Sequence, residues 1–119
     1  MHHLNDRELK KIVAAELKFY KALKVAMENR NELRESGVSQ IFPQLANREV
    51  ETEIKYKQIH RTLTEVLDHN QRQILERKYL GGDPINDIEI YLDMGLTKDQ
   101  FYVIKKEAIR LVATALRII

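Results

Sequence analysis

The sequence predicts an all-α protein, in which a long N-terminal helical hairpin precedes a C-terminal three-helix unit with an extended last helix. Apolar residues recur at the spacing of a helix along most of the chain. No segment shows sustained alternation of apolar and polar residues with β-branched side chains, so we predict no strands. Turn and capping residues separate the helical stretches. The chain therefore divides near residue 69, into residues 1–68 and residues 69–119.

Composition limits the classes of protein to which the chain can belong. Its 119 residues suffice for one domain or two small helical units, with 44 % apolar and 32 % charged residues. Cysteine is absent, which excludes disulfide bonds and thiolate metal sites. No apolar run approaches the roughly 18–20 residues that span a bilayer. Residues 1–6 lack the basic and apolar regions of a signal peptide, so we expect a cytoplasmic protein without membrane contact.

The first helix is predicted from Asp6 to Asn29. Asn5 followed by Glu8 resembles a capping box, with Asn in the place of Ser or Thr. Further apolar residues widen the helical stripe, which predicts burial on more than one side. The stripe consists of Leu9, Ile12, Val13, Phe19, Tyr20, Leu23 and Met27.

The helical pattern stops in residues 30–46. Ser36-Gly37 signals a turn and Pro43 disfavours helix before it, so we interpret this segment as an ordered connecting loop.

A second helix is predicted from about Asn47 to Asp68. Its apolar stripe consists of Val50, Ile54, Ile59, Leu63, Val66 and Leu67.

Glycine, proline and capping residues set the predicted bounds of the last three helices. The third helix is expected to end at Gly81-Gly82, because glycine accepts the left-handed conformation at a helix C-terminus. Asp83-Pro84 can begin the fourth helix as its cap and first residue. Thr97 can begin the last helix, with Gln100 completing a capping box.

The segment from Ile88 to Lys106 has the pattern of a helix-turn-helix, whose second helix can lie in the DNA major groove. Gly95 would provide the sharp turn without a Cβ penalty. Four apolar residues are expected to form a small core that fixes the crossing of the two helices. They are Ile88, Ile90, Phe101 and Ile104.

Polar and basic residues on the last helix are the candidate DNA contacts. We predict base or groove contacts for Lys98, Gln100 and Tyr102, because Gln can pair with adenine and Lys with guanine. Lys105, Lys106 and Arg110 are predicted to contact phosphates. Residues 97–119 carry five bases and two acids, 5 − 2 = +3, whereas the other 96 residues carry 2 − 3 = −1.

These motifs resemble region 4 of bacterial sigma factors. The resemblance covers about Leu67 to Arg117. Within that group the chain is most similar to ArpU/RinA-like phage late transcription regulators, which implies a sigma-70 region 4-like helix-turn-helix and a role in phage or prophage late-gene control in a bacterial host. The motifs are His69-Asn70-Gln71-Arg72-Gln73-Ile74-Leu75-Glu76-Arg77-Lys78-Tyr79-Leu80-Gly81-Gly82, Asp87-Ile88-Glu89-Ile90, Met94-Gly95-Leu96-Thr97 and Ala108-Ile109-Arg110-Leu111. The chain departs from the family pattern at Tyr91, where a small Ala is usual, and at Asp99 and Val103.

No other motif in the sequence predicts chemistry. His60 and His69 lack the usual zinc-ligand spacings. The carboxylates alternate with bases on helix faces, which is typical of solvated charge, and no phosphate-binding glycine loop or nucleophile motif is present. We therefore predict no enzymatic activity, no catalytic residues, no metal site and no cofactor.

The sequence of the N-terminal helices does not determine which partner they bind. Their apolar bands can pack within one chain or form a homodimer, and a dimer would present two recognition helices to half-sites about 34–36 Å apart. The principal prediction is a sequence-specific regulator that binds double-stranded DNA, with these helices supplying either a dimer interface or a surface for host RNA polymerase. One alternative is a small terminase-like DNA-packaging subunit. Another is a helical adaptor that binds RNA polymerase without DNA contact.

Overall fold

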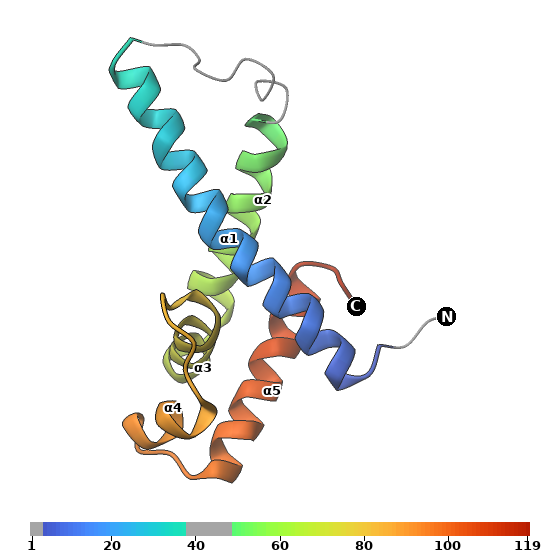
Figure 1. The fold of residues 1–119 in the computed structure, drawn as a ribbon. Helices are drawn as coiled ribbons and strands as arrows, with labels where there is room; N and C mark the ends of the chain where they lie inside the picture. Colours follow the sequence, from blue (N-terminus) through green and yellow to red (C-terminus); the bar gives the residue numbers. More distant parts are fainter. Residues whose placement is uncertain (1–3, 38–48) are drawn as a thin grey trace.

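A computed structural model describes residues 4–37 and 49–119, and all regular structure in these ranges is helical (Figure 1). The all-α prediction is confirmed. In chain order the elements are α1 (Asp6–Glu35), α2 (Glu49–Arg61) with a π-helical turn η2 (Thr62–Val66), α3 (His69–Leu75) with a second π-helical turn η3 (Glu76–Leu80), α4 (Asp87–Asp93) and α5 (Lys98–Ala115). No helix in the described ranges has an apolar stretch long enough to cross a membrane.

The start of α1 matches the prediction and its end does not. The capping box forms, with the Glu8 amide donating to Asn5 Oδ1 at 2.8 Å. The helix continues past Asn29 to Glu35, because no helix breaker occurs before Ser36-Gly37 and Arg30 is held by α2 through a 3.0 Å ion pair with Glu53. The predicted loop around Pro43 and the predicted start of the second helix at Asn47 lie outside the described residues.

The predicted start of the fourth helix is wrong. The helix α4 begins at Asp87, with Asn86 as its N-cap, and not at Asp83-Pro84. Lys78 Nζ donates to the Ile85 carbonyl at 3.0 Å and holds the preceding segment outside the helix. The third helical stretch ends at Gly81 as predicted, because η3 stops at Leu80 and Gly81 is its C-cap. Gly81 has φ −72° and ψ 161°, an extended conformation, so the left-handed geometry predicted there does not form.

The core consists of two clusters that share α5. The smaller one contains Ile74, Ile90 and Phe101, from α3, α4 and α5. The larger one joins α1, α2, η2, α3 and the C-terminal half of α5, and therefore includes residues from both sides of residue 69. In Figure 1, α1 crosses the molecule diagonally, with α2 along one half and α5 against the other. The buried residues of the larger cluster are Leu9, Val13, Leu17, Tyr20, Leu23, Ile59, Leu63, Leu67, Leu75, Ala108, Ile109, Val112 and Ala113.

The predicted small core is correct for Ile90 and Phe101, and Ile104 is partly buried against them. Ile88 is an exception, because its side chain is 58 % exposed. A seven-residue helix that buries Ile90 turns residue 88 away from the same core. Tyr91 packs against the Phe101 ring, with centroids 5.7 Å apart, and takes up the space between the two helices.

Candidate nucleic-acid interface

A tight turn connects α4 to α5 and fixes their relative direction. Gly95 has φ +69°, in the left-handed region that favours glycine. The Leu96 amide donates to the Tyr91 carbonyl at 2.9 Å, and the Gly95 amide to the Leu92 carbonyl at 3.2 Å, so these bonds satisfy the last carbonyls of α4. The turn predicted at Gly95 is confirmed.

The N-terminus of α5 is closed by the predicted capping box. Thr97 Oγ1 accepts from the Gln100 amide at 3.1 Å, and Gln100 Oε1 accepts from the Thr97 amide at 3.0 Å. Pairing with adenine uses both the oxygen and the nitrogen of a Gln side-chain amide. The predicted base contact by Gln100 therefore requires the capping box to open, whereas Lys98, beside it in the first turn, is exposed and available.

Lys105 faces the protein interior, contrary to the prediction of a phosphate contact. Its side chain is only 5 % exposed, and its Nζ lies 3.5 Å from Asp87 Oδ2. The ammonium also lies 5.7 Å from the centre of the Phe101 ring and 5.9 Å from that of Tyr79. The sequence reasoning missed this placement because the partner carboxylate comes from another helix. Lys105 holds α4 against α5 and is not available to a ligand.

Asp87 is the centre of a partly buried ion cluster that joins three elements. Lys78 of η3 binds its Oδ1 at 3.0 Å, and the Tyr102 hydroxyl of α5 donates to its Oδ2 at 3.3 Å. Burial by itself would raise the pKa of Asp87, but Lys78 and Lys105 outweigh it and hold that pKa below the usual 3.8. Burial is also the main reason why the pKa of Lys105 lies below 10.5, although Asp87 opposes this shift. The cluster thus sets where α4 begins.

Lys106 and Arg110 share one carboxylate at the start of α1. Lys106 Nζ lies 2.9 Å and Arg110 Nη2 3.1 Å from the two oxygens of Asp6. Hydrogen bonds from both bases lower the pKa of Asp6. The Lys106 and Arg110 side chains remain 58 % and 59 % exposed, so a phosphate can reach both. Asp6 carries one negative charge and the two bases carry two positive charges, so the group of three keeps a net charge of +1.

A cleft of about 220 Å³ brings part of the predicted site together with a residue that the prediction missed. Tyr102, Lys106 and Arg110 line it from α5, as does the largely buried Lys105, and Asp6 and Lys10 line it from the α1 side. The Tyr102 side chain is 44 % exposed, although its hydroxyl is bound to Asp87. Charge counted over the first helix would have identified Lys10 from sequence, because bases are concentrated there.

Gln100 lies on a different flank of α5. It lines a hollow of about 490 Å³ with Asp99, Val103 and Asn70, and no base contributes to that hollow. The six predicted residues therefore do not share one surface. Tyr102, Lys106 and Arg110 are together, Lys98 is exposed at the helix start, Gln100 is on the other flank and Lys105 is buried.

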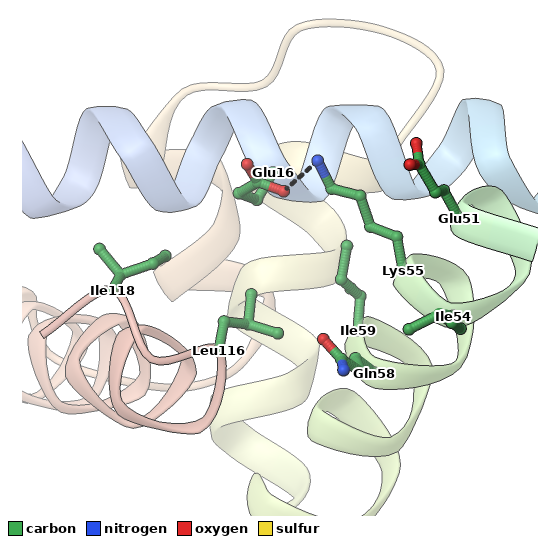
Figure 2. A pocket seen from close by; sticks show the side chains of 8 residues that line it. All are labelled: Glu16, Glu51, Ile54, Lys55, Gln58, Ile59, Leu116 and Ile118. Carbon is green, nitrogen blue, oxygen red and sulfur yellow. Dashed lines mark ion pairs between the residues drawn. The ribbon is translucent and has the colours of Figure 1, made fainter. Parts of the chain in front are cut away.

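Another hollow, of about 390 Å³, lies between α1, α2 and the segment after α5 (Figure 2). Figure 2 shows the Glu16–Lys55 ion pair, 3.2 Å long, beside the apolar side chains of Leu116 and Ile118. Two acids, Glu16 and Glu51, and one base, Lys55, line this hollow, which makes it a poor match for a polyanion. Away from this hollow, His60 Nδ1 and the Tyr20 hydroxyl form a hydrogen bond of 2.9 Å. This bond joins α2 to α1, so His60 has a structural role. No group of three or more potential metal-ligating side chains occurs among the described residues.

Comparison of the chain with models of protein families, with curated proteins and with solved structures found no significant match. The function is therefore inferred from the site itself.

Proposed function

We propose that this protein is a transcription regulator that binds double-stranded DNA through a helix-turn-helix formed by α4 and α5. The observation that carries the proposal is the geometry at Gly95 and Thr97. A left-handed turn followed by a closed capping box directs the first turns of α5 outwards, with Lys98, Tyr102 and Lys106 exposed. In such proteins the second helix enters the major groove. The proposal assigns no reaction, metal or cofactor to the chain.

Each exposed residue of α5 has a defined role in this proposal. Lys98 contacts a guanine edge or a phosphate, and the ring of Tyr102 lies against a thymine methyl group. In the DNA complex, phosphates replace the Asp6 carboxylate as the partners of Lys106 and Arg110. A phosphate presents paired oxygens like those of a carboxylate and carries more charge. Lys105 is excluded from the contact set by its burial.

The resemblance to sigma region 4 extends the proposal to late-gene control in a phage or prophage. In this arrangement α3 to α5 form the DNA-binding unit, and the hairpin of α1 and α2 carries contacts to RNA polymerase or to a second copy. Support for a protein contact comes from large apolar side chains on these helices. Phe19 is 49 % and Ile54 51 % exposed.

The experiment that tests the proposal is selection of bound duplexes from a random pool, repeated at two salt concentrations. A sequence-specific regulator enriches a motif at both concentrations. The variant Lys98→Ala/Tyr102→Ala should lose that enrichment. The control Lys57→Ala/Val50→Ala, which truncates one base and one apolar side chain at exposed α2 positions, should retain it. Absence of any duplex binding by the wild-type protein would refute the proposal.

One observation favours a second function, that of an adaptor which binds a protein and not DNA. Ile88 and Leu92 are 58 % and 67 % exposed and lie one helical turn apart on α4. The same helix contains three acids, Asp87, Glu89 and Asp93, and no base. The first helix of a DNA-bound helix-turn-helix crosses the phosphate backbone, where such acids would be repelled. An adaptor would bind host RNA polymerase, lose that binding in Ile88→Ser/Leu92→Ser, and show no salt-dependent association with duplex DNA.

A further inference from the structure

A larger net positive charge lies on residues 7–24 of α1 than on residues 97–119, which contain α5. Residues 7–24 contain six bases and two acids, 6 − 2 = +4, while the whole chain carries only +2. The other 101 residues therefore sum to 2 − 4 = −2. The bases are Arg7, Lys10, Lys11, Lys18, Lys21 and Lys24.

These six residues form one exposed side of α1, which we name the α1 basic face. All six are exposed, whereas the core residues Leu9, Val13 and Leu17 of the same helix are buried. The spacing from Arg7 to Lys18 and Lys21 is close to whole turns of a helix, so the charges follow its axis. At about 1.5 Å per residue, the face extends for about 26 Å.

The charge of this face is not neutralised within the described part of the protein. None of the six bases forms an ion pair with a described residue. The two acids of the segment are engaged elsewhere. Glu8 completes the capping box with Asn5, and Glu16 binds Lys55 of α2 at 3.2 Å. Unopposed cations along a helix repel one another and favour an external anion.

The length of the face identifies the kind of anion. A small phosphate compound would contact only one or two of the six bases. A duplex carries about one charge per 1.7 Å, and so presents on the order of fifteen phosphates over about 26 Å. An anionic membrane fits less well, because a helix that lies on lipid inserts its apolar face. Most of the large apolar side chains of α1 are buried in the larger core cluster, and only Ile12, Phe19 and Val25 are exposed.

The α1 basic face is continuous with the residues proposed to contact DNA. Lys10 shares the cleft of about 220 Å³ with Lys106 and Arg110 of α5. Further along the helix, Lys21 and Lys24 line a cleft of about 710 Å³ together with Arg77 of η3 and two acids, Glu28 and Glu76. In Figure 1 the N-terminal half of α1 crosses α5 near the C-terminal end of α5, and the first turns of α5 extend away from α1. The two helices meet at the shared cleft, so a duplex that contacts both must reach them from there.

We propose that the α1 basic face binds the phosphate backbone of the same duplex that α5 contacts. This inference rests on the proposed function, because it takes DNA as the ligand of α5. The face supplies affinity without sequence preference, since phosphates are the same at every base pair.

The test measures duplex binding as a function of salt for the full chain and for Lys11→Gln/Lys18→Gln/Lys21→Gln. Gln has a helix propensity similar to that of Lys, so α1 should stay folded, and circular dichroism checks this. Loss of three phosphate contacts should reduce the slope of log K against log salt by about 2.7. The wild-type protein should therefore lose about 40-fold more affinity than the variant between 50 and 200 mM salt. The control Lys57→Gln/Arg61→Gln/Arg117→Gln removes the same charge from α2 and from the end of the chain.

The outcomes separate this inference from the proposed function. An unchanged slope in the α1 variant, with binding lost in Lys98→Ala/Tyr102→Ala, would overturn the inference and leave the proposed function intact. A reduced slope in the α1 variant, with full affinity and motif enrichment in Lys98→Ala/Tyr102→Ala, would support the inference and overturn the role of α5. Equal slope changes in the α1 variant and the control would show a general charge effect and refute the inference. Binding only to vesicles that contain phosphatidylserine, without duplex binding, would overturn both.

Discussion

Asp87 connects α4 to η3 and α5, and the variant Asp87→Asn tests the physical account of this cluster. The substitution keeps the shape of the side chain but removes the charge that faces Lys105, whose side chain is 5 % exposed. Breaking a buried pair costs about 3–5 kcal/mol, because the remaining charge has no partner. Asp87 itself is 20 % exposed, so we expect the free energy of unfolding to fall by about 2–4 kcal/mol.

Lys105→Met changes the other partner and should behave differently. Met occupies a similar volume, and Asp87 keeps Lys78 at 3.0 Å, so the cost should be about 1 kcal/mol or less. The double variant Asp87→Asn/Lys105→Met should be more stable than Asp87→Asn. Urea unfolding at neutral pH, followed by circular dichroism, measures all three. If Asp87→Asn costs less than about 0.5 kcal/mol, or if Lys105→Met costs as much as Asp87→Asn, a buried Lys105 held by Asp87 is the wrong description.

Three further predictions concern stability and the turn. The folded-state pKa of Asp87 lies below 3.8. The Asp87 carboxylate therefore stabilises the fold above about pH 3.8, and this stabilisation is lost as the pH falls through the folded-state pKa. The stability of Asp87→Asn should lack this pH dependence in an acid titration. Gly95→Ala should cost about 1–2 kcal/mol, because φ is +69° and an L side chain is strained there; a thermal melt with unchanged midpoint would contradict the turn geometry. Ile90→Ala should cost about 2–5 kcal/mol in urea unfolding, whereas Ile88→Ala should change stability by about 0.5 kcal/mol or less because Ile88 is 58 % exposed.

Features determined by neighbouring residues could be predicted from the sequence. The capping boxes at Asn5 and Thr97 each depend on a residue three positions later, and both form as predicted. The turn at Gly95 depends on a single residue that can adopt positive φ. In each case the atoms that make the hydrogen bonds are encoded within one turn of helix, so no knowledge of the rest of the fold is needed.

Features that depend on distant contacts could not be predicted in the same way. Asp83-Pro84 is a good local start for a helix, but Lys78 binds the Ile85 carbonyl and Asp87, and α4 begins later. The residue type of Lys105 predicts a place at the surface, whereas its partner Asp87 lies on another helix and holds it in the interior. Such ion pairs cannot be recognised from the sequence, because the two partners are far apart along the chain. A charged side chain is buried only where the tertiary structure places an opposite charge beside it.

The candidate DNA contacts all come from the last helix, and the sequence of one helix does not indicate which residues of another helix lie beside it. Residues 97–119 carry a positive excess of +3, but residues 7–24 carry +4. The proximity of Lys10 to Lys106 and Arg110 depends on how α1 packs on α5. DNA binding itself remains a prediction, and the variants described above test it for each helix separately.

The sharing of α5 between the two core clusters has a consequence for how the protein unfolds. Phe101 belongs to the smaller cluster, while Val112 and Ala113, about three turns further along, belong to the larger one. A fragment of residues 69–119 would therefore lose the α1 and α2 side of the larger cluster and expose the apolar end of its own longest helix. Melting of α1 and displacement of α5 are in this way one cooperative event. The end of α5 that is proposed to contact DNA is then only as rigid as the packing of its opposite end against α1.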